Sequence, residues 1–187
     1  MTKKVLNQND IYVQKLIDTV EPDFVFSSRP VDRFSVSSKN YDNENQNKYN
    51  KLLKLKEQIN SIEDCNLKDN STNLVIGDGN INSSIMLIGE APGEIEDKSG
   101  HSFQGDIGSL LKKMLSAINI NIEKVYLTYS INFRPPEDRK PTSNEIKRYS
   151  VFLKEHISII NPKILILMGS TAMEAVTGLN SKISNER

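Results

Sequence analysis

The chain has 187 residues, of which 37% are hydrophobic and 26% charged, with 24 basic and 24 acidic side chains and a single cysteine. This length suits one ordinary domain with an extension, and the balanced charge gives no global attraction to nucleic acid or to an acidic membrane. No apolar run reaches the roughly 18 residues of a membrane-spanning helix, and no apolar segment follows Lys3 and Lys4 as it would in a secretory signal. We therefore expect a cytoplasmic protein with no membrane partner and no internal disulfide.

The first part of the chain is weakly patterned. Near-helical spacing of apolar residues predicts a short amphipathic helix over 10–20, and the polar run 37–50, rich in Asn and Ser, is typical of a linker. Helical spacing returns at 51–62, which we expect to pack on the domain that follows. We divide the chain into an amino-terminal extension with an Asn-rich linker, residues 1–50, and a domain at residues 51–187.

From residue 84 onward, apolar runs alternate with helical patterns. Strands are predicted at 83–89, 124–130 and 163–169, and helices at 106–118, 144–160 and from about residue 170. Residues 90–105 are predicted to form a long loop. This alternation predicts a central parallel sheet with helices on both faces, a three-layer α/β/α sandwich with ligand groups at the carboxyl ends of the strands.

Two loops at those strand ends contain candidate functional residues. The first is GEAPGEIED at 89–97, continued by GHSFQGDIGSLL, where glycines allow the backbone to approach a ligand and four acids lie outside any expected core. The second is NFRPPEDRKP at 132–141, where adjacent prolines fix a corner among three cations that could contact phosphates. Taken singly, each has an ordinary interpretation, as a turn, as solvated arginines or as a core Phe.

Taken together, the two loops and the later segment NPKILILMGSTA have the order and spacing of the family-4 uracil-DNA glycosylases, which the chain resembles over about residues 62–187. A weaker match, PVDRF at 30–34, is similar to an extension of some bacterial members. The family hydrolyses the N-glycosidic bond of uracil in DNA after the nucleotide has left the duplex. The resemblance implies a uracil-DNA glycosylase-like fold, a hydrolase of base excision DNA repair, and DNA, single-stranded or uracil-containing, as its partner.

The resemblance also implies roles for individual residues. Two acids, Glu90 and Glu96, would be catalytic, near the water and the sugar. The base would be bound by the loop wall and by one stacked ring, contributed by Ala91, Pro92, Gly93 and Phe103. The DNA backbone would be contacted by Arg134, Pro135 and Arg139.

The chain departs from the family at the 4Fe-4S cluster. The resemblance puts the four ligand positions at Ile62, Cys65, Phe133 and Tyr149, so only Cys65 remains. Because such a cluster is normally held by four cysteines, we expect no iron–sulfur cluster and no other metal or cofactor. Apolar and aromatic packing is expected to take the place of the cluster.

A second departure affects catalysis. The family's base-reading Asn falls at Tyr129, which lacks the paired amide donor and acceptor, and Asn132 does not replace it. The family's final His-Pro motif would follow a further strand beyond the last residue of this chain, and neither His101 nor His156 is expected to replace its histidine. Loss of one such electrostatic group costs on the order of a hundred- to thousandfold in rate.

We therefore expect a carboxyl-terminally truncated and catalytically impaired glycosylase, whose strand at 163–169 is left as an exposed sheet edge. Two alternatives remain open. The chain could be a non-enzymatic remnant that binds DNA or a protein through the retained loops. It could also be one half of a split glycosylase, completed by a separate carboxyl-terminal fragment.

Overall fold

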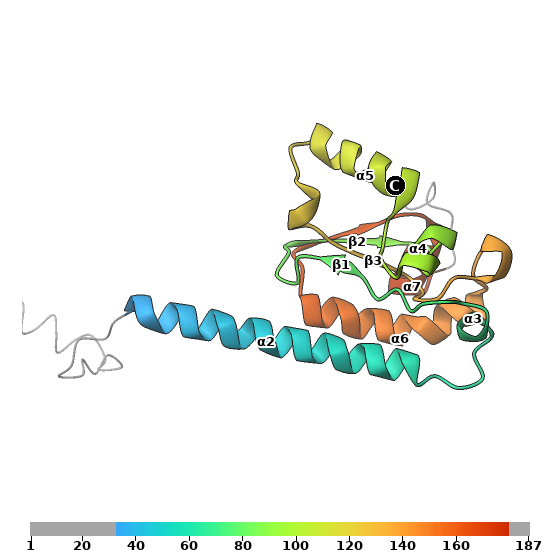
Figure 1. The fold of residues 1–187 in the computed structure, drawn as a ribbon, viewed down its shortest axis with the longest axis horizontal. Helices are drawn as coiled ribbons and strands as arrows, with labels where there is room; N and C mark the ends of the chain where they lie inside the picture. The colour runs from blue at the N-terminus through green and yellow to red at the C-terminus, as the bar shows by residue number, and fades with distance from the viewer. Residues whose placement is uncertain (1–32, 180–187) are drawn as a thin grey trace, which may run out of the picture. The chain divides into compact units, whose positions relative to one another are not determined.

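The computed structural model describes residues 33–179, with side chains described from residue 44 onward. The chain separates into two units, residues 1–39 and 40–187, and the second unit contains the sheet and its helices (Figure 1). The helix predicted over 10–20 lies outside the described residues. The predicted domain division at residue 50 stays a prediction.

Helix α2, Arg33–Asn60, includes the run 37–50, so our prediction of a linker there is wrong. The run contains neither Pro nor Gly, and no residue in it blocks a helix that continues into the leucine-rich turns at 51–60. Its polar side chains also have partners: Lys48 Nζ donates to the carbonyl oxygen of Ile160 at 2.9 Å, and Asn45 Oδ1 accepts a hydrogen bond from Asn82. Tertiary contacts therefore outweigh the weak helix propensity of a polar segment.

The sheet has four strands in the order β1-β3-β2-β4. Their bounds are β1 Asp78–Gly79, β2 Ile85–Gly89, β3 Tyr126–Tyr129 and β4 Ile164–Leu167. Strand β2 pairs in parallel with β3 and with β4, whereas β1 pairs antiparallel with β3. The three predicted strands and their parallel arrangement are confirmed. Strand β1 was not predicted, because two residues show no apolar pattern.

Four helices follow the strands and loops of this unit. Their bounds are α4 Glu94–Ser99, α5 Gly105–Ala117, α6 Ser143–Ile160 and α7 Ser170–Thr177, with shorter turns at α3 Asn66–Asp69, η1 Ile122–Lys124 and η2 Pro136–Asp138. The three predicted helices are confirmed. Our prediction of an uninterrupted loop over 90–105 is wrong because it contains α4, a helix too short to show a periodic apolar pattern.

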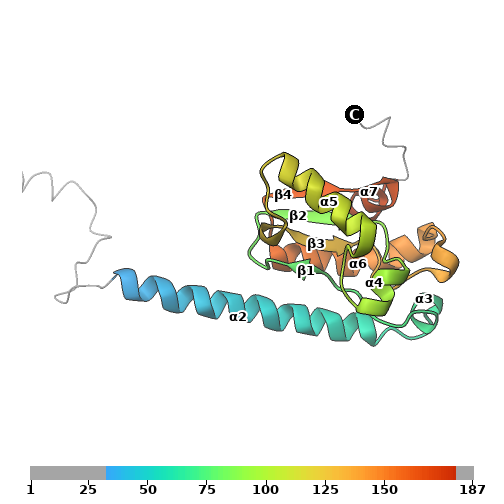
Figure 2. The ribbon, with the colours of Figure 1, turned by 45° about the horizontal axis from the view of Figure 1, so that its top comes forward.

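The two faces of the sheet bury different helices, which confirms the three-layer arrangement. On one face, Leu87 and Leu127 pack against Leu111 and Leu115 of α5. On the other face, Met86, Ile88 and Tyr126 pack against α6 and α7 through Ile146, Leu153, Ala172 and Ala175. Figures 1 and 2 show α5 and α6 on opposite sides of the sheet. The carboxyl ends of β2 and β3 lead into the loops at 90–93 and 130–135.

Strand β4 forms an edge of the sheet within the described residues, because β2 is its paired neighbour there. Ile164 and Leu165 are 53% and 37% exposed. The exposed apolar edge expected at this strand is therefore present. Within residues 33–179, no helix has the length and apolarity to cross a membrane.

Candidate active site

Glu96 ties together the two halves of the first loop. The loop leaves β2 at Gly89, and α4 begins at Glu94. The Glu96 side chain is buried, and its Oε2 accepts a hydrogen bond from the Gly93 amide at 3.1 Å while its Oε1 accepts one from the Gln104 amide at 2.9 Å. The Glu96 carboxylate therefore holds two backbone segments in place. Its Oε2 holds the GEAPG loop, and its Oε1 holds the segment that carries Phe103.

Asp78 in strand β1 holds the same segment from the other side. Its Oδ2 accepts hydrogen bonds from the Ser102 amide and hydroxyl at 2.5 and 2.7 Å, and its Oδ1 pairs with His101 Nδ1 at 2.9 Å. Burial raises the pKa of Asp78, but the hydrogen bonds from Ser102 and His101 outweigh it, so the pKa lies below the ordinary value. Asp78 was not among the predicted site residues, and the Asp-Gly pair at 78–79 is its only local signal in the sequence.

Phe103 and Tyr129 form a buried aromatic pair at the carboxyl ends of β2 and β3. Their rings are stacked, with centroids 4.8 Å apart and planes 16° apart. The Tyr129 hydroxyl accepts a hydrogen bond from the Phe103 amide at 2.9 Å. Phe103 has a φ of 51°, in the left-handed region, which costs a non-glycine residue energy and is offset here by these contacts. Phe103 was predicted in the site, whereas the stacking of Tyr129 against it was not predicted.

Glu90 differs from Glu96 in having a free carboxylate. It is half-buried directly after Gly89, and among residues 33–179 its side chain has no hydrogen-bond or ion-pair partner. Of the three predicted wall residues that follow it, Ala91 and Gly93 are half-buried and Pro92 is buried. The two acids of the first loop are therefore in different electrostatic situations, because both oxygens of Glu96 accept hydrogen bonds and Glu90 has no such partner among the described residues.

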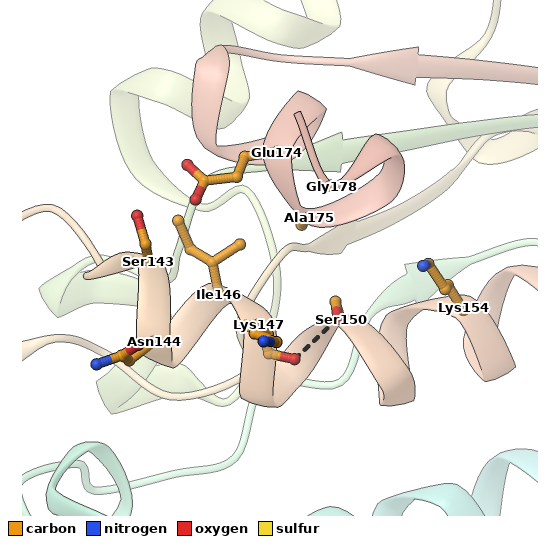
Figure 3. Close-up of a pocket in the computed structure, with 9 residues that line it drawn as sticks. All are labelled: Ser143, Asn144, Ile146, Lys147, Ser150, Lys154, Glu174, Ala175 and Gly178. Carbon is orange, nitrogen blue, oxygen red and sulfur yellow. Dashed lines mark hydrogen bonds between the residues drawn. The ribbon is translucent and has the colours of Figure 1, made fainter. Parts of the chain in front are cut away.

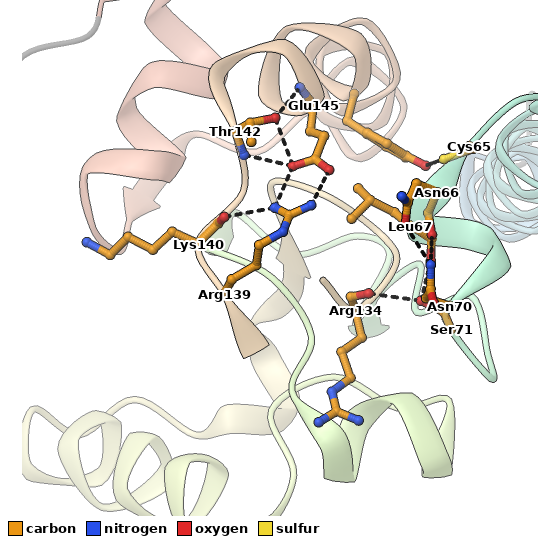
Figure 4. Close-up of polar contacts among 11 residues, drawn as sticks. Cys65, Asn66, Leu67, Asn70, Ser71, Arg134, Arg139, Lys140, Thr142 and Glu145 are labelled. Atoms are coloured by element: carbon orange, nitrogen blue, oxygen red, sulfur yellow. Dashed lines mark hydrogen bonds and ion pairs between the residues drawn. The ribbon is translucent and has the colours of Figure 1, made fainter. Parts of the chain in front are cut away.

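Both predicted DNA-contacting arginines are already paired with carboxylates. Arg134 donates from Nε and Nη2 to the two carboxylate oxygens of Asp138, at 2.7 and 2.9 Å. Arg139 donates from Nη1 and Nη2 to the two carboxylate oxygens of Glu145, at 2.9 and 2.7 Å, and Figure 4 shows this second pair. The Arg139 guanidinium, with further hydrogen bonds from the Thr142 cap of α6, lowers the pKa of Glu145 to about 2. Pro135, between them, is buried. These two loop cations are neutralised within the chain.

The four positions that the family-4 resemblance assigns to cluster ligands lie in one hydrophobic core. Cys65, Phe133 and Tyr149 are buried members of that core, and Ile62 packs against it. The Cys65 Sγ and Tyr149 Oη atoms are 3.1 Å apart, and the Phe133 and Tyr149 rings meet edge to face. The expected packing is present. Only one of the four positions carries a thiol, and the other three side chains have no sulfur that could bind iron. This set of residues does not fit a cluster that is held by four cysteines.

The two histidines of the chain face other partners. His156 in α6 is buried, and its Nε2 lies 2.9 Å from the Tyr126 hydroxyl. Burial lowers the pKa of His156 to about 4, so its imidazole is neutral at pH 7. His101 is held by Asp78 as described. That neither histidine replaces the family's histidine stays a prediction.

A separate groove of about 430 Å³ lies between α6 and α7 (Figure 3). Its lining includes Asn144, Lys147, Ser150, Lys154 and Glu174. None of the predicted site residues lines this groove, so it is distinct from the site at the carboxyl ends of β2 and β3.

The pattern of the Uracil DNA glycosylase superfamily matches residues 76–186. This match covers more than half of the chain and includes β2, β3, β4 and both candidate loops. The chain therefore belongs to the uracil-DNA glycosylase superfamily.

Individual relatives point to one branch of that superfamily. The chain is 40% identical over 117 residues to the Type-4 uracil-DNA glycosylase of Thermotoga maritima, which is 63% of this chain and 61% of that protein. It is 41% identical over 119 residues to the Type-4 enzyme of Sulfurisphaera tokodaii, covering 63% and 54%. It also matches 13% of a DNA polymerase of Bacillus phage SP01, at 31% identity over 124 residues. The chain thus spans little more than half the length of its Type-4 relatives, and the family-4 resemblance is confirmed.

Proposed function

We propose that this chain is a DNA-acting domain of base excision repair whose base site lies at the carboxyl ends of β2 and β3, and that it releases uracil poorly. Its similarity to proteins named Type-4 uracil-DNA glycosylases supports the substrate class. The observation that carries the placement of the site is the pair of hydrogen bonds that Glu96 accepts, which join the Gly93 end of the GEAPG loop to the segment that follows Phe103.

The two predicted catalytic acids divide their roles in this proposal. Glu90, whose carboxylate has no partner within the described residues, is available to position a water or to stabilise positive charge on a sugar. Glu96 acts as a positioning residue, because both of its oxygens accept backbone hydrogen bonds. A buried carboxylate with two such bonds fixes the shape of the pocket wall rather than reaching out to a substrate.

Slow uracil release follows from two observations. Tyr129, at the position of the family's base-reading Asn, offers a hydroxyl whose oxygen is already bonded to the Phe103 amide. His101 and His156 are held by Asp78 and by Tyr126, so neither is free to stabilise a departing base. With the base-reading amide replaced by a phenol whose oxygen is already bonded, we expect a loss of rate on the order of a hundredfold or more, the usual effect of losing one preorganised hydrogen-bonding group.

We propose that no iron–sulfur cluster contributes to this chain. The hydrophobic core around Cys65, Phe133 and Tyr149 supports this, because its side chains already contact one another where ligands would have to meet a cluster. The positions would be stabilised by packing alone. A colourless preparation without iron, measured by metal analysis of the purified full chain, is the expected result.

Uracil release tests the catalytic part of the proposal. The purified full chain is incubated with single-stranded and with duplex oligonucleotides that contain one deoxyuridine, and abasic sites are counted after alkaline cleavage. We expect slow release that Glu90→Gln abolishes, whereas Glu155→Gln, an exposed acid on α6 and therefore a matched charge control, leaves it unchanged. Rapid release by the natural chain contradicts impairment, and release unaffected by Glu90→Gln contradicts the assigned role.

DNA binding tests the role of the second loop. For Arg134 to reach a phosphate, it must first leave Asp138, and an exposed pair of this kind holds with only about 0–1 kcal/mol. Asp138→Asn should therefore tighten binding to a single-stranded oligonucleotide, Arg134→Gln should weaken it, and Glu137→Gln on the same turn is the control. Unchanged affinity in both Asp138→Asn and Arg134→Gln would remove this loop from the interface.

The separate carboxyl-terminal fragment remains a second candidate for a partner. The exposed apolar residues Ile164 and Leu165 on β4 support it, because an unpaired strand edge can accept a further strand. Co-expression of the chain with the carboxyl-terminal segment of a Type-4 relative tests it. Co-purification that the substitution Leu165→Lys abolishes is expected, and binding indifferent to that substitution contradicts pairing at β4. The location in the cytoplasm stays a prediction.

A further inference from the structure

The Phe103 and Tyr129 rings fill the interior of the site. The two rings are 7% and 5% exposed and lie within 16° of parallel, with centroids 4.8 Å apart. This is the offset-stacked arrangement that aromatic rings prefer over a direct sandwich. A planar pyrimidine stacked on the same ring of Phe103 would require the same spacing and tilt. The Tyr129 ring therefore meets the geometric requirements of a bound base.

The polar end of Tyr129 strengthens this likeness. Its hydroxyl accepts a hydrogen bond from the Phe103 amide at 2.9 Å. Burial, with the nearby Glu96 carboxylate, raises the pKa of Tyr129, so the phenol is neutral at pH 7. Proteins hold an extruded base by stacking on its faces and by hydrogen bonds to its edge. Tyr129 receives both kinds of contact from its own chain.

Gly89 limits the width of this slot. A Cβ atom added at Gly89 would lie 2.8 Å from Tyr129 Cδ1 and 2.9 Å from Phe103 Cζ, closer than side-chain carbons approach one another. Position 89 of β2 therefore faces the edges of both rings, and no side chain fits between it and them. The Tyr129 ring covers a face of Phe103 on which a nucleobase would stack.

We propose that Tyr129 is a built-in occupant of the base slot, an inference that rests on the proposed function. Phe103 and the Gly89 backbone form the walls, and the Tyr129 ring takes the place of a six-membered pyrimidine. While the Tyr129 ring stays in place, neither free uracil nor an extruded uracil base fits in this slot, so the slow uracil release proposed above requires the ring to move out first. Removal of the ring opens the slot to a planar pyrimidine with polar edge groups.

Binding of free uracil to the purified full chain tests this. The variants are Tyr129→Ala and Tyr129→Asn, with Tyr149→Ala as a control that removes a buried tyrosine ring from a different core. Uracil is titrated while the unfolding temperature and the saturation-transfer NMR signal of uracil are recorded. We expect no uracil effect on the natural chain or on Tyr149→Ala. Both Tyr129 variants should show saturable binding and an unfolding temperature that rises with uracil concentration.

Each outcome supports or overturns the inference. Folded Tyr129 variants that bind no uracil would show that the ring is core packing only, and binding by the natural chain as strong as by the variants would show that the slot is open. Should the small variants fail to fold, Tyr129→Leu keeps most of the apolar volume without a flat ring and is judged by the same criteria. Failure of the proposed function is scored separately, because rapid uracil release by the natural chain contradicts impairment whatever the Tyr129 variants bind.

Discussion

Acidification from pH 7 to pH 5 should destabilise this protein mainly through His156. The imidazole is 2% exposed and lies between α6 and the sheet, and burial lowers its pKa from 6.5 to about 4. Between these two values the unfolded chain binds a proton that the folded chain does not bind. The free energy of unfolding therefore falls as the pH falls below 6.5, and the loss is complete near pH 4. It amounts to about 2 kcal/mol at pH 5 and about 3 kcal/mol in full.

Urea unfolding followed by circular dichroism at pH 7, 6 and 5 measures this loss. A decrease of about 2 kcal/mol moves the midpoint by about 1 M urea for a domain of this size. His156→Gln can keep a hydrogen bond to Tyr126 and carries no titrating group, so its midpoint should hardly change over the same range. Equal pH dependence in the natural chain and in His156→Gln would refute the reasoning.

Two further substitutions follow from short contacts. Gly89→Ala places a methyl group within 3 Å of the Tyr129 and Phe103 rings, so it should lower the free energy of unfolding by about 1–3 kcal/mol. Urea titration measures this loss. An unchanged unfolding midpoint would mean that the two rings move apart without cost. Glu145→Gln breaks the pair with Arg139 and should cost about 1 kcal/mol at pH 7, after allowance for solvent around a partly exposed pair. Because the pKa of Glu145 is lowered to about 2, this difference should be present above pH 4.5 and disappear as the pH falls toward 2, and a difference that persists there would contradict it.

The sequence predicted the sheet better than the site. Strands β2 and β4 are continuous apolar runs and α5 and α6 have clear helical periods, so local pattern was sufficient for them. The predicted linker at 37–50 failed because contacts such as that of Lys48 with the Ile160 carbonyl come from residues far away in sequence. The hydrogen bonds that Asp78 accepts from the segment at 101–102 were not predicted for the same reason. Counting charges also overestimated how many cations of the second loop are available to DNA, because it could not show that Arg134 and Arg139 have carboxylate partners.

The core around Cys65 gives a last prediction. If aromatic packing has taken the place of the family's cluster, then returning one position to cysteine removes packing without restoring a set of four ligands. Phe133 is 3% exposed, so Phe133→Cys should lower the free energy of unfolding by about 3–5 kcal/mol, as truncations of buried Phe do.

Phe152→Cys is the matched control for this substitution, since Phe152 is half-buried against the same core. Its cost in urea unfolding should be clearly smaller than that of Phe133→Cys. Equal costs would mean that the position of the former ligand contributes no more than the rim of the core. In that case packing at Phe133 could not account for how this domain is stable with a single cysteine.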